Sequence, residues 1–183
     1  MEDELSLSDA TALRALAHPL RLRLLRLLRN LGPSTATRLA ERVDEVPAAV
    51  SFHLRQLQRY GFISELPERG RGRERWWQAR HRRQRIDESR LTAAEARLAA
   101  GELAEVVLRQ AFDIHLRAYQ AVEPGWRPRD SEVGLWLTAG ELNDIADQVD
   151  SLIRGYAERS EDGRPAGAEL CHVSFLAARW LRP

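Results

Sequence analysis

A serine and a histidine stand two positions apart at Ser51 and His53, and these residue types can share a proton in nucleophilic catalysis. The surrounding segment, residues 46–63, reads VPAAVSFHLRQLQRYGFI and has apolar residues at helical spacing. An α-helix turns by about 100° per residue, so the two side chains would point roughly 200° apart. A catalytic dyad is therefore excluded at this place.

The helix predicted over 47–60 separates an apolar stripe from a polar outer face. Val50, Leu54 and Leu57 form the stripe, and His53 lies at its margin. Small residues near the start of the outer face allow close approach to base edges, and Arg and Gln supply hydrogen-bond donors. The outer face consists of Ala48, Ser51, Phe52, Arg55, Gln58 and Arg59. This pattern is typical of the recognition helix of a helix-turn-helix.

The segments on either side support this interpretation. Apolar spacing and proline positions predict three short helices ahead of it, over residues 8–17, 19–31 and 34–43, with Ser34 or Thr35 as the cap of the third. After Gly61, FISEL and RWWQA alternate like strands, and the glycine-rich PERGRGRE lies between them. We predict a two-stranded wing over 62–79. Its tip carries arginines that can neutralise phosphates, namely Arg69, Arg71, Arg73 and Arg75.

The motifs ALAHPLRLRLLRLL, TRLAERV, VSFHLRQLQRYGFI and RGRERWWQA together resemble the winged helix-turn-helix of ArsR-type bacterial transcriptional regulators. The resemblance covers residues 8–80 and rests on L-x-H-P-x-R and S-x-H-L-x-x-L-x-x-x-G at this spacing. It implies a homodimer that places helix 47–60 in the major groove and the wing along the DNA backbone. It also implies that Ser51 and its face touch DNA, while His53 packs behind the reading helix.

The expected contacts divide by role. Base edges would be approached by Ser51, Phe52 and Arg55, and phosphates would be bound by side chains of the preceding helix, the reading helix and the wing. The complete predicted DNA-binding set is Thr35, Ala48, Ser51, Phe52, Arg55, Arg59, Arg71 and Arg73.

Residues that could bind a metal are sparse. Cys171 is the single cysteine, which excludes an intrachain disulfide and a cysteine-rich metal site. The Cys-x-Cys pattern of metal-sensing ArsR-type regulators is absent from the helix before the reading helix, and their Asp-x-His pattern is matched only by Asp113 and His115. Cys171 and His172 are adjacent and would point to opposite faces of a strand. We expect no metal, no cofactor and no enzymatic activity.

Charge is distributed unevenly along a chain of 183 residues with a net charge of only +1. Residues 1–90 contain 18 arginines and 12 acidic residues, whereas residues 91–183 contain 10 arginines and 15 acidic residues. The two halves therefore have different electrostatic roles. The acidic N-terminus lacks the apolar core of a signal peptide, and no uncharged apolar stretch approaches about 18 residues. We expect a soluble, cytoplasmic protein without membrane association.

The second half, residues 81–183, is predicted to be a C-terminal element for dimerisation or effector binding. The basic run RHRRQR at 80–85 is either a solvated linker or a phosphate contact. A long helix over 91–122 would pair with its twin, because about thirty residues span roughly 45 Å, too far to bury against one small domain. Beyond it we expect a strand at 133–137, a helix opened by a Thr138–Glu141 capping box, and a second strand within 168–181.

Five aromatic residues in this element are either core or the lining of a pocket for a small-molecule effector: Trp126, Trp136, Tyr156, Phe175 and Trp180. The sequence as a whole predicts a mostly α-helical fold with a two-stranded β wing, followed by a C-terminal α/β element. The corresponding function is a sequence-specific, homodimeric regulator that binds a double-stranded DNA operator. The alternative is a winged-helix module that binds a protein partner and has no intrinsic specificity for duplex DNA.

Overall fold

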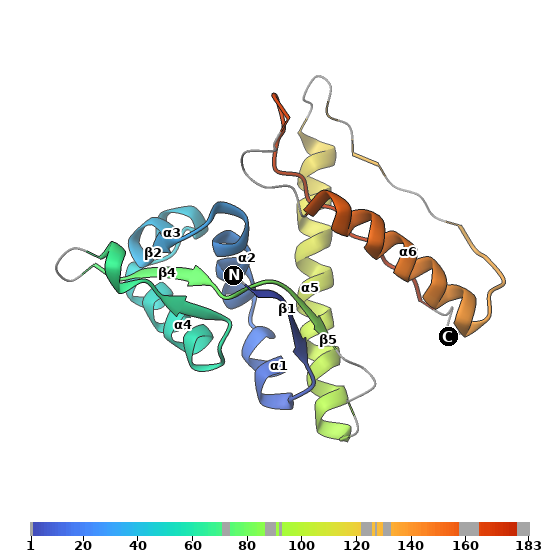
Figure 1. The fold of residues 1–183 in the computed structure, drawn as a ribbon, viewed down its shortest axis with the longest axis horizontal. Coiled ribbons are helices and arrows are strands. Elements are labelled where there is room, and N and C mark those ends of the chain that lie inside the picture. Colours follow the sequence, from blue (N-terminus) through green and yellow to red (C-terminus); the bar gives the residue numbers. More distant parts are fainter. Residues whose placement is uncertain are drawn as a thin grey trace. The chain divides into compact units, whose positions relative to one another are not determined.

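The computed structural model describes residues 2–70, 74–86, 91, 93–121, 126, 128–129, 133–157 and 165–178. The chain divides into two compact units, Met1–Phe112 and Asp113–Pro183. The first unit contains four short helices, α1 (Ala10–Leu16), α2 (Pro19–Leu31), α3 (Ala36–Val43) and α4 (Pro47–Arg59), followed by the wing. Its compact core extends beyond residue 80, because α5 (Ala94–Gln120) packs its first half into the same unit. Figure 1 shows α3 and α4 side by side.

The four helices begin where the sequence provides caps. The carboxylate of Asp9 accepts from the backbone N–H of Ala12 at 2.9 Å, and the His18 Nδ1 accepts from the N–H of Leu20 at 3.2 Å. Pro19 and Pro47 occupy the first turns of α2 and α4, where a missing N–H costs nothing. Helix starts predicted from these residues are therefore confirmed to within about two residues, the usual uncertainty of a helix boundary.

Gly61 ends α4 and turns the chain into the wing. Its φ of 75° lies in the left-handed region, which costs a residue with a Cβ about 1–2 kcal/mol. The N–H of Gly61 donates to the carbonyl of Gln58 at 2.9 Å, and the N–H of Phe62 donates to that of Leu57 at 3.0 Å. This pair of bonds is a Schellman motif, and it positions Phe62 to enter the core directly after the helix.

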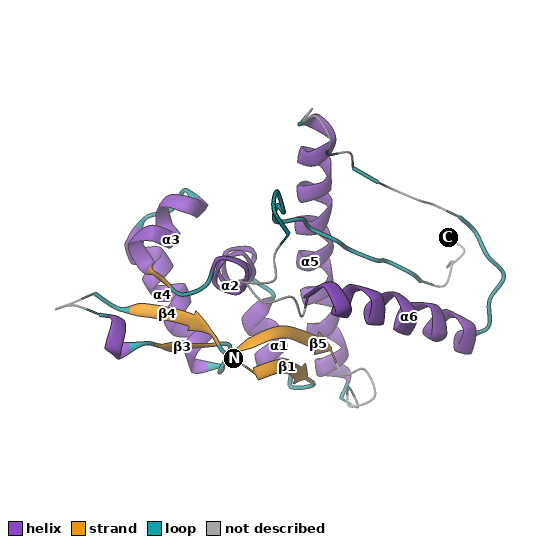
Figure 2. Ribbon diagram, turned by 45° about the horizontal axis from the view of Figure 1, so that its top comes forward, coloured by secondary structure: helices purple, strands orange, loops and turns teal. Residues whose placement is uncertain are grey.

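Two small sheets complete the first unit. In the antiparallel sheet, β4 (Trp76–Ala79) lies between β2 (Ser34–Thr35) and β3 (Ile63–Glu65), and the 3₁₀ turn η1 (Pro67–Arg69) follows β3. The predicted wing strands are thus present in β3 and β4. The second sheet pairs β1 (Glu2–Leu7) with β5 (His81–Ile86) in parallel, with Leu7 opposite Ile86. Figure 2 shows β1 and β5 as neighbours, separate from β3 and β4.

The core of the first unit is aliphatic and is assembled from every helix of the winged domain. Leu13, Leu24, Leu54 and Phe62 are fully buried, and each comes from a different element or turn. Leu103 of α5 is buried in the same cluster. At roughly 25 cal/mol per Å² of apolar area removed from water, this shared cluster is the main stabilising contribution in the unit.

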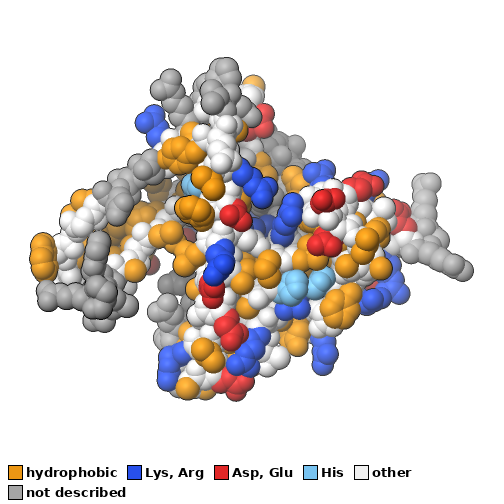
Figure 3. All heavy atoms as spheres, turned by 180° about the vertical axis from the view of Figure 1, so that it is seen from behind, with side chains coloured by type: hydrophobic (Ala, Val, Ile, Leu, Met, Phe, Trp, Pro, Cys, Tyr) orange, Lys and Arg blue, Asp and Glu red, His pale blue; other side chains and the backbone are white. Residues whose placement is uncertain are grey.

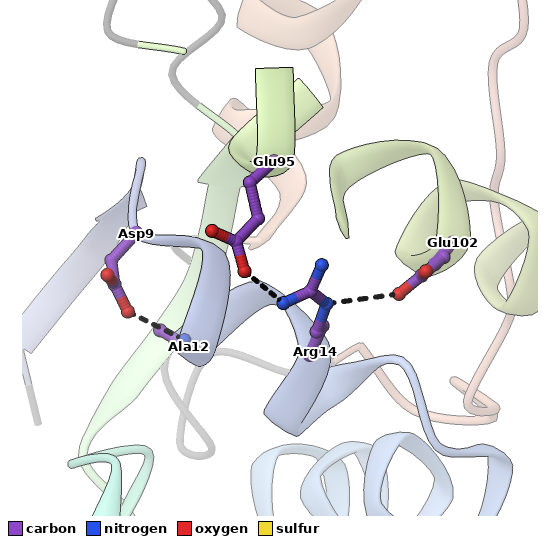
Figure 4. Close-up of polar contacts among 5 residues, drawn as sticks. All are labelled: Asp9, Ala12, Arg14, Glu95 and Glu102. Carbon is purple, nitrogen blue, oxygen red and sulfur yellow. Dashed lines mark hydrogen bonds and ion pairs between the residues drawn. The ribbon is translucent and has the colours of Figure 1, made fainter. Parts of the chain in front are cut away.

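Polar contacts join α5 to the first two helices. Arg14 of α1 lies between two carboxylates of α5, with Glu95 at 2.6 Å and Glu102 at 3.7 Å (Figure 4). Arg26 of α2 donates to the Gln110 side chain at 3.0 Å, and Gln110 donates to the Pro19 carbonyl at 2.8 Å. Helix α5 therefore contacts α1 near its start and α2 about two to four turns further along.

The second unit contains α6 (Ala139–Ala157), opened by the predicted capping box. The Glu141 carboxylate accepts from the Thr138 N–H at 2.7 Å, and the Thr138 hydroxyl accepts from the Glu141 N–H at 3.2 Å. These hydrogen bonds to Thr138 lower the pKa of Glu141. Among the residues described, no helix is long and apolar enough to cross a membrane.

The mostly helical fold, the wing and a helix in the C-terminal element are as predicted. The strands expected in that element are absent from its described residues. Residues 133–138 and 168–178 form neither helix nor strand, and every one of their side chains is exposed. A strand is stable when it pairs and buries one face, and β-branched or aromatic composition alone supplies neither condition. The prediction of strands at 133–137 and 168–181 was therefore wrong for the part of these segments that the structure describes.

Candidate nucleic-acid interface

Helix α4 is held by its inner face and presents its outer face to solvent. Val50, Leu54 and Leu57 are all 0% exposed, as the apolar stripe predicted. Phe52 is 51% exposed on the opposite side, and Arg55 is exposed with it. Of the other predicted contact residues of this helix, Ala48 and Arg59 are exposed and Ser51 is half-buried. The structure thus gathers these five side chains on the solvent side of one helix.

Two histidines lie behind this face. The His18 and His53 rings are 4.5 Å apart between centroids, and the His53 and Phe52 rings are 5.2 Å apart between centroids in an edge-to-face arrangement. Burial lowers the pKa of both histidines, and the nearby Arg21 lowers it further. The His53 Nδ1 is buried and has no hydrogen-bond partner among the described residues. His53 therefore joins α4 to the start of α2, the scaffold role that the resemblance implied.

The turn between α3 and α4 is fixed from two sides. Asp44 ends α3 with a φ of 58° in the left-handed region, a position that Asp tolerates better than most residues with a Cβ. Arg23 of α2 donates to the carbonyls of Arg42 and Val43 at 3.2 and 3.3 Å. These carbonyls would otherwise lack intrahelical partners at the helix end. The angle between α3 and α4 thus depends on Arg23 as well as on the core.

Thr35 is placed differently from what a phosphate contact requires. It is 4% exposed, and its hydroxyl accepts from the Arg38 N–H at 3.4 Å as the N-cap of α3. A buried hydroxyl engaged in a cap has little surface left for DNA. The structure therefore shows Thr35 as the N-cap of α3, and its contact with a phosphate stays a prediction.

The wing is described up to its tip. Arg71 and Arg73, two of the predicted phosphate contacts, lie outside the described residues. Arg75 pairs with Glu65 of β3 at 3.7 Å. Trp76 is half-buried, and the guanidinium carbons of Arg38 and Arg69 lie 4.9 and 6.0 Å from its ring centroid. Arg38 was missing from the predicted set, because nothing in the spacing of the sequence brings it to the wing.

The basic run after the wing is strand β5 and not a linker. Arg29 of α2 donates from Nε to the His81 carbonyl at 2.9 Å and from Nη1 to the Gln84 side chain. Burial, followed by the neighbouring Arg26, lowers the pKa of Arg29 to about 10, so it stays charged at neutral pH. On the face drawn in Figure 3, basic and acidic side chains are interspersed and form no patch of one sign.

The aromatic residues predicted to line a pocket are exposed where the structure describes them. Trp136 is 100% exposed, Tyr156 60%, Trp126 45% and Phe175 42%. Trp180 lies outside the described residues. A single chain therefore does not enclose a ligand between the four described rings, and the effector pocket stays a prediction.

The structure also locates the remaining candidate metal ligands. In the second unit, the His115 and His172 rings lie 5.3 Å apart, edge to face. Cys171 is exposed. In the described part of the chain, no group of three or more His, Cys, Asp or Glu side chains is placed to hold a metal ion. The two histidines thus form an aromatic contact within the second unit.

The architecture of the first unit is that of a winged helix-turn-helix domain. Residues 16–65 match a family model described as a helix-turn-helix domain, which covers α2 to β3. No curated protein matches the sequence. Among solved structures, the apo form of a double mutant of Lactococcus lactis ZitR is 18% identical, covers 77% of this chain and 83% of its own, and has a TM-score of 0.32. A second structure of that mutant is also 18% identical, with coverages of 75% and 73% and a TM-score of 0.30.

Proposed function

We propose that the protein is a DNA-binding transcriptional regulator that reads the major groove with α4 and contacts the backbone with the wing. One observation carries the proposal: α4 is fixed by three wholly buried side chains and turns Ala48, Phe52, Arg55 and Arg59 outward next to a β wing. The match of residues 16–65 to a helix-turn-helix model supports it.

The outer face of α4 has the chemistry for base recognition. Arg55 can donate two parallel hydrogen bonds to guanine O6 and N7, which is the commonest specific contact in the major groove. The exposed ring of Phe52 fits contact with a thymine methyl group, and the small Ala48 permits the helix to enter closely. Arg59, one turn after Arg55, would bind a phosphate and set the register.

In the finer form of the proposal, the protein is an ArsR-type regulator that acts in the cytoplasm as a homodimer. A two-fold dimer reads two half-sites about one helical turn of DNA apart, or a multiple of that distance. The second copy would pair along α5, where Leu98, Leu108 and Phe112 are exposed at 62%, 43% and 66%. Apolar side chains of this size on one helix are typical of a helix that is buried in an assembly.

Selection of bound sequences from a random duplex pool tests the proposal directly. We expect enrichment of one motif with two inverted halves, and retention of that duplex in a gel-shift assay at low salt. No retention of any duplex at low salt would contradict DNA binding and favour the alternative, a winged-helix module that binds a protein partner. Enrichment of an asymmetric single half-site would contradict the homodimer while leaving DNA binding in place.

A further inference from the structure

Two arginines from different segments converge on one tryptophan of the wing. The Arg38 Cζ in α3 lies 4.9 Å from the centroid of the Trp76 ring, and the Arg69 Cζ in η1 lies 6.0 Å from it. We call these three residues the arginine–tryptophan stack. The stack joins the helix-turn-helix to the wing through a single side chain.

The ring at the centre of this stack is itself held in place. Trp76 belongs to β4, the central strand of its sheet, where it pairs with Thr35 of β2. The next residue, Trp77, is 2% exposed and packs in the core, so Trp76 points to the opposite face of the strand. The Trp76 Nε1 donates to the Glu74 carboxylate at 3.2 Å. The indole plane is therefore fixed by the sheet at one end and by a hydrogen bond at the other.

Arg38 is held at its backbone as well as at its guanidinium group. Its N–H donates to the Thr35 hydroxyl in the cap of α3, and Thr35 is the residue opposite Trp76 in the sheet. Thr35, which caps α3, is thus the direct neighbour of Trp76 across the two paired strands. The contact with the ring restricts the rotamers of the Arg38 side chain, so less conformational entropy is left to lose on binding.

Neither guanidinium group donates a hydrogen bond to another described residue, so the donors of both arginines are available. A guanidinium group that lies over a ring uses its π face, and its N–H groups still point outward in the plane. In the described part of the chain, neither Arg38 nor Arg69 forms an ion pair with a carboxylate, whereas Arg75 of the same wing pairs with Glu65. Both arginines are exposed. The two guanidinium groups next to the Trp76 ring are therefore free to bind an anion.

We infer that Trp76 is a positioning residue that holds Arg38 and Arg69 for a phosphate of the DNA backbone, an inference that rests on the proposed DNA-binding function. Preorganised donors lose less conformational entropy on binding, so the contact is stronger than that of two mobile arginines. The stack also keeps the wing at a constant distance from α3. The DNA backbone would then be contacted by α3 and the wing together.

A salt titration with the selected duplex tests the role of the stack. We expect Arg38→Ala to weaken binding about tenfold, as for loss of a charged hydrogen bond, and to lower the slope of log affinity against log salt by about one. Trp76→Leu should weaken binding as well, and the double variant should lose less affinity than the sum of the two single losses, because the ring acts partly through Arg38 and partly through Arg69. Arg109→Ala removes an exposed arginine that pairs with Glu105 in α5, and it should leave the slope unchanged.

Conservative variants separate positioning from folding. Trp76→Phe keeps a ring under Arg38 and should restore most of the affinity that Trp76→Leu loses, while Arg38→Lys keeps the charge without the planar stack and should bind several-fold more weakly than the parent. Full affinity in Arg38→Lys, or an unchanged slope in Arg38→Ala beside a clear loss in Arg55→Ala, would overturn the inference and leave the proposed function standing. Absence of duplex binding by the parent protein would instead remove the proposed function, and the inference with it.

Discussion

At the scale of single residues, the outer face of α4 separates side chains that should read sequence from those that should bind any DNA. Arg55 lies in the middle of the exposed face, and Arg59 lies one turn further, near the Tyr60 ring at 5.9 Å. If the first reads a base and the second a phosphate, the two substitutions must have different effects. The same charge is removed in both cases, so the comparison controls for net charge.

We expect Arg55→Ala to cost about 1–3 kcal/mol of binding to the selected duplex and to leave binding to a scrambled duplex almost unchanged. Arg59→Ala should weaken both duplexes alike. The measurement is a pair of equilibrium titrations by fluorescence anisotropy at one salt concentration. An equal loss on both duplexes for Arg55→Ala would assign this residue to the backbone and not to a base.

The histidine pair should make stability depend on pH in a defined direction. His18 and His53 have pKa values below the usual 6.5, because burial disfavours the charged form of both. Arg21 lowers the pKa of His18 further, against a backbone hydrogen bond that raises it. His18 and then Arg21 lower the pKa of His53 further, against Glu45, which raises it. As pH falls through about 6.5, the unfolded chain takes up protons before the folded protein does. The free energy of unfolding therefore falls below about pH 6.5 and does not depend on this pair well above it.

Urea unfolding measured at several pH values between 7 and 5 checks this expectation. His53→Phe keeps an aromatic ring against His18 and removes one titrating group, so its loss of stability over this range should be smaller than that of the parent. His18 is the N-cap of α2 and is left in place, because its substitution would add the loss of the cap. A pH profile identical to that of the parent would show that His53 does not contribute.

At the scale of elements, the helices of the winged domain could be predicted from the sequence and the second sheet could not. Apolar spacing and Pro19, Pro47 and Gly61 locate the ends of helices because those signals are local. Strands β1 and β5 carry acidic and basic residues in place of an apolar alternation, and their pairing joins residues about eighty positions apart. The contacts that matter there, such as Arg29 to His81, are non-local and leave no pattern in the sequence.

In the candidate site, too, the features set by neighbouring residues could be predicted, and those set by distant residues could not. The outer face of α4 followed from helical geometry alone, which requires only neighbouring residues. Arg38 escaped the prediction because its partner, Trp76, is close in space only after β2 and β4 have paired. The C-terminal strands were predicted from composition, and composition does not provide a pairing partner. Distance along the chain, and not chemical type, decided which predictions succeeded.

Arg29 provides a test of how firmly β5 is held. Arg29→Met keeps the length of the side chain, but it leaves the half-buried carbonyl of His81 without its donor. We expect a loss of about 1–3 kcal/mol in the free energy of unfolding, measured by urea denaturation. Arg109→Met, which removes an exposed ion pair within α5, should cost no more than about 0.5 kcal/mol. Equal stability of Arg29→Met and Arg109→Met would mean that the contact between α2 and β5 is not stabilising.

At the scale of the whole molecule, the exposed apolar side chains of α5 favour formation of a dimer. Leu98 and Phe112 are exposed on the part of α5 that is tied to α1 and α2 through Arg14 and Gln110. A dimer formed along α5 would therefore fix the separation of two reading helices through a short series of direct contacts. Because the fixed separation matches one operator spacing, assembly and DNA recognition would be coupled.

We expect the parent chain to be a dimer and the variant Leu98→Glu, Phe112→Glu to be a monomer, because charge on the apolar face would have to be buried without a partner. Light scattering after size-exclusion chromatography measures both masses. The control Leu31→Glu introduces one glutamate at another exposed leucine, outside α5, and should remain a dimer. A monomeric parent at micromolar concentration would contradict assembly along this helix.

One residue, Arg80, separates the end of β4 from the start of β5, and its N–H donates to the Phe62 carbonyl at 3.1 Å. The wing is therefore joined to β5 by a single hydrogen-bonded residue and not by a flexible linker. If DNA deflected the wing, the displacement would pass through Arg80 to β5 and from β5 to β1, with which β5 pairs. In the proposed complex, the first strand of the chain would therefore respond to DNA binding, although it lies outside the outer face of α4.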